Sequence, residues 1–291
     1  MTNVPPQRVS AISAPAAYLL PGRPEGAAAA TQDAYRQTQF LLGGDLDLFA
    51  AAMNLQLALL QDAHPSRYRT HSLAAIVALW SRAYLYLADA ALLTSCGAYA
   101  STLPLVRAAC EAIGAEEGLR GGEMDEHNLW LANTLKPSEA FKAFEFDLGR
   151  YYAGDVIAAD PVLRPVFRAA TDLARPNFGA SLIQVAPESN NNRLAIAFGD
   201  TSFHLGWAEI VLGWLMALAG RQLGLVLAAE GVFPVTDERR NACADQRSRI
   251  EAALARPDRA AIQEVEDGND RRYLIVNFRR TSGGAPKKIL L

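Results

Sequence analysis

Long stretches whose apolar residues recur at the helical period, separated by short breaks, run through most of this chain from Tyr35 onward. The breaks contain residues that end and begin helices, namely Gly43-Gly44, Pro65, Gly97 and Gly121-Gly122. Because each such stretch carries an apolar stripe that must be buried, the pattern predicts a mainly α protein, a multi-helix bundle. The helices are expected at about 31–42, 45–63, 70–95, 98–119, 124–135, 138–153, 161–174, 202–230 and 237–255.

Two regions carry short β-compatible runs instead of helical ones. Two runs on either side of a loop of turn-forming residues predict an inserted β-hairpin at about 181–199. Arg272–Phe278, followed by a Gly-Gly turn and a short last run, predicts a C-terminal β-hairpin at about 272–291. The expected fold is therefore a helical bundle that carries two hairpins.

The N-terminal region differs from the rest of the chain. Residues 1–30 contain five prolines and an alanine run without sustained periodicity, so we expect a disordered N-terminal arm. The chain has 291 residues, about half of them hydrophobic, which is enough for one sizeable core. Residues 31–291 are accordingly expected to form a single helical domain with the C-terminal hairpin as an appendage.

The run Trp207–Ala229 is the best candidate for a membrane span, but Glu209, Arg221 and Gln222 interrupt it. The uninterrupted part is too short to cross a bilayer, so we predict a buried core helix and no membrane partner. The three cysteines are scattered, and the N-terminus lacks the pattern of a signal peptide, which indicates a cytoplasmic protein. Scarce lysine and abundant alanine are typical of high-GC bacterial genomes.

The most informative group of charges lies on the two helices that flank Gly97. If these helices form an antiparallel hairpin, Arg82 and Glu111 lie level with each other, and Asp89 and Arg107 form a second pair nearer the turn. Arg107 and Glu111 also share one helix face at i, i+4 spacing. Two interpretations remain open: a buried ionic network that fixes the helix register, or a charged pocket that binds a small anion or nucleotide.

Two further segments are candidate binding surfaces. In the loop Arg175–Ser181, Arg175, Asn177 and the backbone amides could bind an anion, or the loop could simply position the next element. The stretch 271–291 has six basic residues and no acidic one. That charge could contact RNA or DNA, or it could protect an edge strand against aggregation.

The motifs of the common enzyme and metal classes are missing from the sequence. The four histidines do not pair at the i, i+4 spacing of metal ligands, and there is no Gly-rich phosphate loop, Rossmann fingerprint or Gly-x-Ser-x-Gly elbow. We therefore predict no metal and no cofactor, and a binding role rather than an enzymatic one.

The stretch Tyr99-Ala-Ser-Thr-Leu-Pro-Leu-Val-Arg-Ala-Ala-Cys-Glu111 resembles the Arg-x-x-x-Glu helix of several uncharacterised bacterial helical-bundle families, some of them related to the HEPN superfamily. Active HEPN ribonucleases carry an arginine followed after four to six residues by a histidine, and Arg120 and His127 have six residues between them. The resemblance implies a metal-independent ribonuclease in which Arg120 stabilises phosphate charge and His127 acts as acid or base.

Three functions follow as hypotheses. The leading one is a non-catalytic binding or assembly module, with a homodimer as a candidate state. The alternatives are a HEPN-like ribonuclease acting on RNA, and a receptor for a small anionic ligand that uses Arg82, Arg107 and Glu111.

Overall fold

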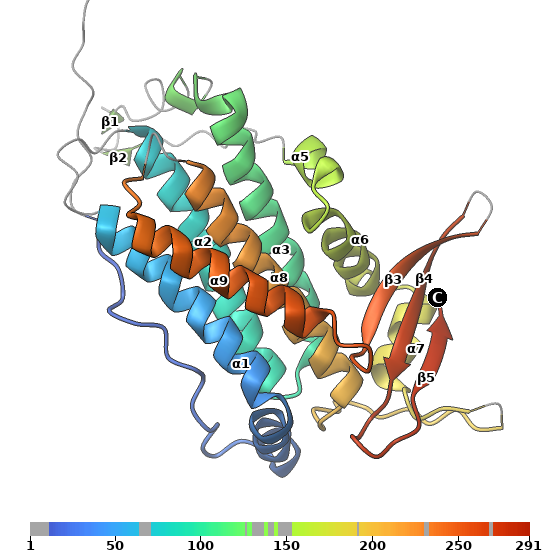
Figure 1. Cartoon of the computed structure of the whole chain (residues 1–291). Helices are drawn as coiled ribbons and strands as arrows, with labels where there is room; N and C mark the ends of the chain where they lie inside the picture. The colour runs from blue at the N-terminus through green and yellow to red at the C-terminus, as the bar shows by residue number, and fades with distance from the viewer. Residues whose placement is uncertain are drawn as a thin grey trace, which may run out of the picture.

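The protein is described from a computed structural model, which covers residues 12–63, 71–125, 127–129, 137–138, 143–144, 153–190, 192–229, 233–267 and 270–291. Helices dominate, and a small antiparallel sheet near the C-terminus lies at one end of them (Figure 1). The predicted mainly α class, a helical bundle with a C-terminal hairpin, is confirmed.

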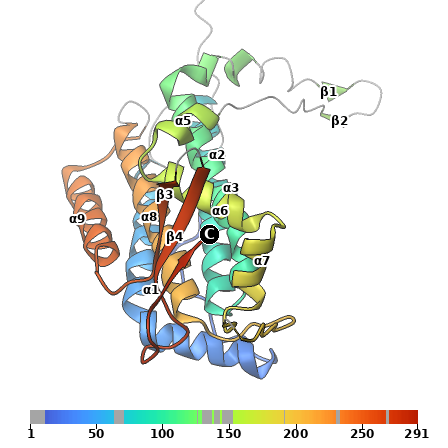
Figure 2. The same cartoon turned by 90° about the vertical axis from the view of Figure 1, so that its right-hand side faces the viewer.

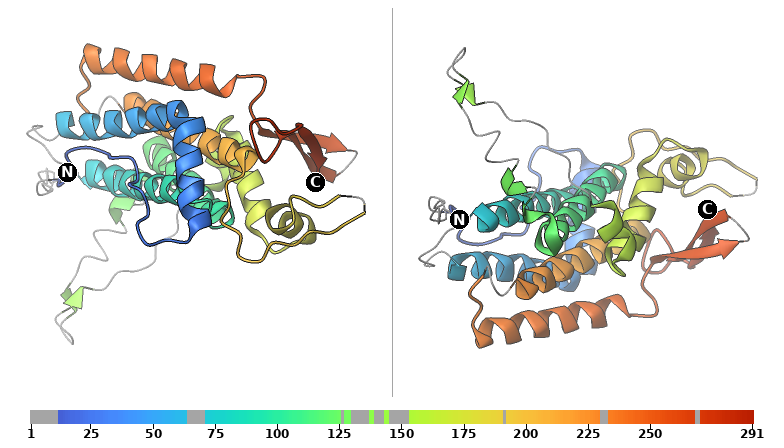
Figure 3. Two further views of the ribbon diagram at one scale, coloured as in Figure 1. Left: turned by 90° about the horizontal axis from the view of Figure 1, so that it is seen from below. Right: turned by 90° about the horizontal axis from the view of Figure 1, so that it is seen from above.

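In the part of the chain that the structure describes, five long helices make the bundle, and the most apolar of them lies in its middle. Helix α8 is buried along nearly its whole length because the other long helices surround it, with α9 on the outer side (Figure 3). Its apolar residues on all faces are what a fully buried helix requires. The long helices are α1 (Ala29–Ala63), α2 (His71–Ser95), α3 (Tyr99–Gly118), α8 (Leu205–Ala228) and α9 (Asp237–Leu254).

The predicted break at Gly43-Gly44 is a kink rather than a gap. Helix α1 runs through this region, but Leu42 has non-helical backbone angles (φ −123°, ψ 20°). The first turns of α1 consequently lie across the end of the bundle, while the rest runs along it (Figure 3). Adjacent glycines weaken a helix enough to allow such a bend without ending it.

The predicted helix end at Gly121-Gly122 is wrong. Helix α3 passes directly into a π-helical turn, η1 (Leu119–Glu123), and Met124 keeps helical angles. Glycine lowers the stability of a helix but does not forbid one, so neighbouring contacts decide the outcome. The predicted helices 124–135 and 138–153 fall largely outside the described residues. The short strands β1 (Pro137–Ser138) and β2 (Ala143–Phe144) pair there.

Three shorter helices cover one side of α3 and the sheet end of the molecule (Figure 2). They are α5 (Gly154–Ala159), α6 (Leu163–Ala174) and α7 (Phe178–Val185). Asp160 begins α6, since its Oδ1 accepts hydrogen bonds from the backbone N–H groups of Val162 and Leu163, both at 2.8 Å. Asp160 directly precedes Pro161, and an Asp-Pro pair is a favourable helix start, so Asp160 acts here as an N-terminal cap.

The predicted hairpin at 181–199 is wrong. Its first run belongs to α7, and its second run, 194–198, belongs to no strand, although Asn190 and Arg193 form an isolated bridge. Asn177 starts α7 because its side chain accepts a hydrogen bond from the N–H of Ala180 at 2.7 Å. Ala180 and Ile183 are buried at i, i+3 spacing. A short apolar run is compatible with helix or strand, and the cap decides it here.

The C-terminal sheet has one strand more than predicted. Its order is β3-β4-β5, with both pairs antiparallel, and Ile275 faces Ile262 on one side and Ile289 on the other. The missed strand β3 carries acidic residues between its apolar ones, which weakens the strand signal of the sequence. The strands are β3 (Ala261–Asp267), β4 (Asp270–Phe278) and β5 (Lys287–Leu290).

Part of the predicted disordered arm packs on the bundle. Residues 1–11 lie outside the described residues, but from Ile12 the chain runs along α1 and α2. Tyr18 packs edge-on against Phe49 and Tyr84, and its backbone N–H donates to Asn54 Oδ1 at 2.8 Å. Aromatic burial and this hydrogen bond hold the segment despite its prolines.

Among the described residues, two helices are long and apolar enough to cross a membrane by length and composition, α8 and the Leu73–Ser95 part of α2. Most of α8 is buried inside the protein, whereas α2 is buried to a smaller extent. Core helices of soluble proteins have the same composition as α8, so length and composition alone do not distinguish a buried core helix from a membrane-spanning one.

Candidate functional site

The interface between α2 and α3 is apolar, and the predicted ionic network across it is wrong. Ala83 and Leu87 of α2 and Val106 and Cys110 of α3 are buried there. Within the described part of the chain, no ion pair joins α2 to α3. The count of residues from Gly97 gave the height of each charge along the helices. It did not give the direction in which each side chain leaves the helix axis. In the folded protein the charged side chains point away from the interface.

The charges of this pair of helices bond within their own helix instead. Arg107 donates from Nη2 and Nε to Glu111 Oε1, at 3.1 and 3.3 Å. Arg82 donates to the hydroxyl of Tyr86 at 3.0 Å. Both pairs have i, i+4 spacing, so each costs little side-chain ordering and leaves its charge at the surface. Asp89 is exposed.

A pocket of about 440 Å³ opens beside this interface, between α2, α3, α5 and α6. Gly114 lets α5 approach α3 closely there, since a Cβ at this position would lie 2.7 Å from Ile157 Cγ1. Arg82 and Glu111 both line the pocket, as the second interpretation of the sequence required. The lining residues are Leu79, Arg82, Tyr86, Ala108, Glu111, Ala112, Ala115, Ala153, Gly154, Ile157 and Phe167.

A second hollow, of about 240 Å³, adjoins the first and is basic. The two share Gly154, Ile157 and Phe167, so these residues separate one from the other. The guanidinium of Arg107 lies over the ring of Phe167, with its Cζ 5.8 Å from the ring centroid. The second hollow is lined by Gly154, Ile157, Ala158, Arg164, Phe167, Arg168, Thr171, Asp172 and Arg175.

The two hollows together carry an excess of positive charge. Arg168 bonds Glu264 at 2.8 Å and Arg175 lies 3.6 Å from Asp172, so these charges are balanced. Among the described residues, Arg82 and Arg164 have no carboxylate partner. Guanidinium groups without a carboxylate are the natural partners of phosphate and carboxylate ligands.

Asn177, which was predicted to bind an anion, has a structural role. Its Oδ1 caps α7 and its Nδ2 donates to the backbone oxygens of Asp172 and Arg175, at 2.9 and 3.4 Å. These contacts use both polar groups of the side chain. Arg175, in contrast, lines the basic hollow.

The proposed ribonuclease residues lie beyond α3. Arg120 belongs to η1, and its guanidinium donates to the carboxylate of Glu117. Glu117 also accepts from Arg221 at 3.1 Å. His127 lies in the short helical stretch 127–129 and is half-buried. A phosphate bound at Arg120 would have to compete with a carboxylate that is already in contact.

A buried polar cluster between α3 and α8 was not predicted. Arg221 donates to Asp160 Oδ2 at 2.6 Å, and beside it Gln222 donates to Glu116 Oε2 at 2.7 Å. Glu116 and Gln222 are wholly buried. The sequence signal was the polar pair Arg221-Gln222 inside an apolar helix. Burying such a pair costs free energy unless both side chains have hydrogen-bond partners. Its presence in a buried helix therefore predicts acidic residues on a neighbouring helix.

Burial raises the pKa of Glu116 to about 8, although the hydrogen bond from Gln222 works in the opposite direction. In the unfolded chain the same carboxyl titrates near 4.5. Between these values the folded protein binds one more proton than the unfolded chain. The contribution of Glu116 to stability is therefore full below pH 4.5 and is lost as the pH rises towards 8.

We expect Glu116→Gln to remove this dependence, with a gain over the wild type that grows by up to about 1.4 kcal/mol per pH unit between pH 5 and 8. Urea unfolding at several pH values measures it. Glu111→Gln, in the same helix but half-exposed, is the control and should follow the wild type. Parallel curves for Glu116→Gln and wild type would show that Glu116 is not protonated in the fold.

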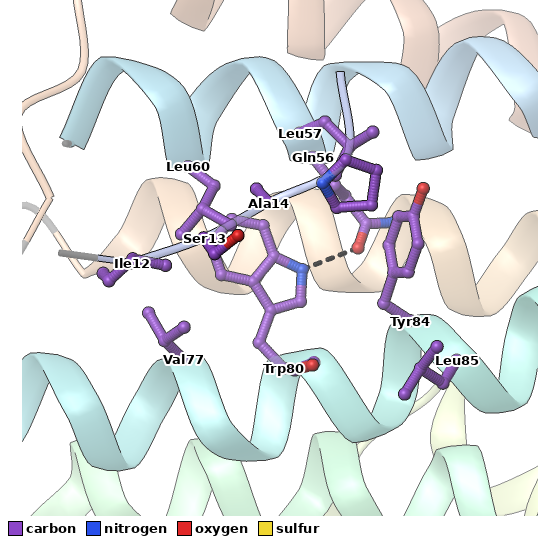
Figure 4. A pocket seen from close by; sticks show the side chains of 12 residues that line it. Ile12, Ser13, Ala14, Gln56, Leu57, Leu60, Val77, Trp80, Tyr84 and Leu85 are labelled. Atoms are coloured by element: carbon purple, nitrogen blue, oxygen red, sulfur yellow. Dashed lines mark hydrogen bonds between the residues drawn. The ribbon is translucent and has the colours of Figure 1, made fainter. Parts of the chain in front are cut away.

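Another pocket lies under the N-terminal segment and is small, about 120 Å³. Ile12, Ser13 and Ala14 cross over Trp80, whose indole N–H donates to Gln56 Oε1 at 2.7 Å (Figure 4). Ligand pockets for small organic molecules start at roughly 300 Å³. This space is therefore a packing gap beneath the segment rather than a ligand site.

Comparison with known proteins gives no assignment: no protein-family model matches the chain, and no curated protein or solved structure is significantly similar to it. Within the described residues, no group of three or more His, Cys, Asp or Glu side chains could hold a metal ion.

Proposed function

We propose that this protein is a non-catalytic binding protein for a small organic anion, and that the pocket between α2, α3, α5 and α6 holds the ligand. The volume of about 440 Å³ carries the proposal, because it lies in the range of pockets that bind small organic molecules. The pocket is mostly apolar with few polar groups, which is also typical of such sites.

The lining determines the class of ligand. Ala112, Ala115 and Phe167 offer an apolar wall for a hydrocarbon or aromatic part. Arg82 offers a guanidinium whose hydrogen-bond partner is the neutral hydroxyl of Tyr86, so a carboxylate or phosphate can bind it without displacing another anion. An anionic group that extends past Phe167 would meet Arg164. The favoured ligand is an organic carboxylate or phosphate monoester with an apolar body.

A thermal-shift measurement tests this proposal with a panel of aromatic and aliphatic carboxylates and phosphate monoesters. A true ligand at a hundred times its Kd should stabilise the protein by about 2.7 kcal/mol, seen as a rise in Tm. Arg82→Ala should abolish that rise while leaving the Tm without ligand close to that of the wild type, since Arg82 is exposed.

Arg36→Ala is the matched control, because Arg36 is also exposed and also bonds a residue of its own helix, Asp33. It should keep the full ligand response. A response that survives Arg82→Ala, or is lost equally in Arg36→Ala, would contradict the assignment of the pocket.

We place this activity in the cytoplasm. The support is chemical: Cys96, Cys110 and Cys243 are free thiols, and the last two are buried. Unpaired cysteines are usual where the environment is reducing.

A further inference from the structure

The segment 194–198 has the properties of a β-strand that lacks a partner. Leu194, Ile196 and Phe198 are exposed, at 60%, 65% and 102%, whereas Ala195 and Ala197 between them are only partly exposed. This alternation is the pattern of an extended strand with one face towards the protein. The sequence independently predicted a strand here, but no strand of the described fold pairs with it.

The hydrogen bonds of this segment follow the same alternation. The N–H of Ala195 donates to Ser189 Oγ at 3.0 Å, and the N–H of Ala197 donates to the carbonyl of Val185 at 2.7 Å. Both groups point into the molecule. In an extended strand, the N–H and C=O groups of the residues in between point to the opposite edge. Leu194, Ile196 and Phe198 therefore present a free edge, which is a template for pairing with another chain.

A second apolar row lies next to this edge on α7. Phe178, Leu182 and Val185 are exposed and occupy one helix face at i, i+4 and i+7. The bond from Ala197 to Val185 joins the two rows. We call these six side chains the α7 surface. Together they expose on the order of 700 Å² of apolar area, more than a monomer usually leaves open and close to the share of each partner in a stable dimer.

We propose that a second copy of this chain covers the α7 surface, with the two 194–198 segments paired antiparallel about a two-fold axis at Ile196. A two-fold axis makes the same surface serve both copies. Each Leu194 then lies opposite Phe198 of the second copy, and apolar cross-strand pairs of this kind stabilise a sheet.

The charges at the two ends of the segment support the antiparallel arrangement. Arg193 precedes it and Asp200 follows it. Antiparallel pairing brings each arginine towards Asp200 of the other copy, a carboxylate that also lies 3.7 Å from Arg280 of its own chain, whereas parallel pairing would bring like charges together. Across the described residues, Arg193 has no carboxylate partner within its own chain.

Light scattering after gel filtration tests the proposal at about 50 μM chain, above the roughly micromolar to picomolar range of Kd that interfaces of this size cover. The wild type should give twice the chain mass of 31.4 kDa. Ile196→Pro, which removes the central N–H, and Phe198→Asp should both give the monomer mass. Phe40→Asp is the matched control, because Phe40 is as exposed but lies on α1; it should stay dimeric.

Cross-linking tests the register separately. Opposed residues of a hydrogen-bonded antiparallel pair have Cα atoms about 5.5 Å apart, which suits a disulfide. Mild oxidation should therefore join Ile196→Cys into a covalent dimer, while Phe40→Cys and the wild type stay single chains.

A wild type of 31.4 kDa at this concentration would overturn the proposal, even if it bound lipid vesicles through the same surface. So would a dimer that survives both Ile196→Pro and Phe198→Asp. A dimer that Ile196→Cys does not cross-link would overturn the antiparallel pairing. Circular dichroism on each variant separates dissociation from unfolding, because a folded monomer keeps the helical spectrum.

Discussion

Gly97→Ala is expected to destabilise the protein by about 3 kcal/mol or more and to lower its Tm by roughly 10 °C. Gly97 ends α2 in the left-handed region, with φ +76°, which costs a residue with a side chain about 1–2 kcal/mol. A Cβ at this position would also lie 2.1 Å from the backbone oxygen of Thr201. A backbone atom cannot rotate away as a side chain can, so the loop that contains Gly97 and the loop that contains Thr201 must move apart.

Gly43→Ala is the matched control for this experiment. Gly43 lies in α1, and no atom comes within 4 Å of a Cβ built there. Alanine is the better helix former by about 0.5–1 kcal/mol, so this variant should be as stable as the wild type or slightly more stable. Thermal unfolding followed by circular dichroism measures both. A Gly97→Ala protein that melts within two degrees of the wild type would mean that the contact with Thr201 is not as close as described.

The second large effect is expected for Arg259→Ala, which should cost about 3–5 kcal/mol. Arg259 and Asp45 are each only 3% exposed, and Nη1 lies 2.5 Å from Asp45 Oδ2. Arg259 also donates to the backbone oxygen of Glu209 at 2.7 Å. Removing the guanidinium leaves a buried carboxylate with Arg256 alone, at 3.3 Å, and a buried carbonyl without this donor.

Urea unfolding measures this loss, and Arg239→Ala supplies the comparison. Arg239 bonds Asp62 at 2.9 Å, but both side chains are about one-third exposed, so its removal should cost less than about 1 kcal/mol. The double variant Asp45→Asn with Arg259→Met should be more stable than Arg259→Ala, because no buried charge remains unpaired. If the double variant were less stable, the loss would come from packing and not from charge.

The fold class and most long helices could be predicted from the sequence because their signals are local. A helix such as α6, whose buried apolar residues recur at the helical period, can be recognised within about 11–18 residues, and so can a start such as Asp160-Pro161. Where the local signals were balanced, the prediction failed. The run 181–186 is compatible with a helix or a strand. It is helical because Asn177 caps it and because Gln184 and Ile183 hydrogen-bond to Leu173 and Trp207, which lie outside the run.

The candidate site was found only in part. Arg82 and Glu111 do line one pocket, because residue counts along a helical hairpin give heights reliably. The predicted bonding partners of Arg82 and Glu111 were wrong, because the position of a residue along a helix does not determine the direction of its side chain. The remaining walls come from Gly154, Ile157 and Phe167, and nothing in the local sequence indicates that these residues lie against α2 and α3.

Asp45 shows the same division most clearly. Asp45 follows Gly43-Gly44, a position where the local sequence favours a helix cap and gives no reason to expect more. In the folded chain α1 continues through it, and its carboxylate bonds Arg259, 214 positions away. By itself the sequence determined the fold class and most of the long helices, since period and capping act over a few residues. The tertiary structure decided which charges meet and where a pocket opens, because these depend on the relative rotation of helices whose contacts join distant parts of the chain.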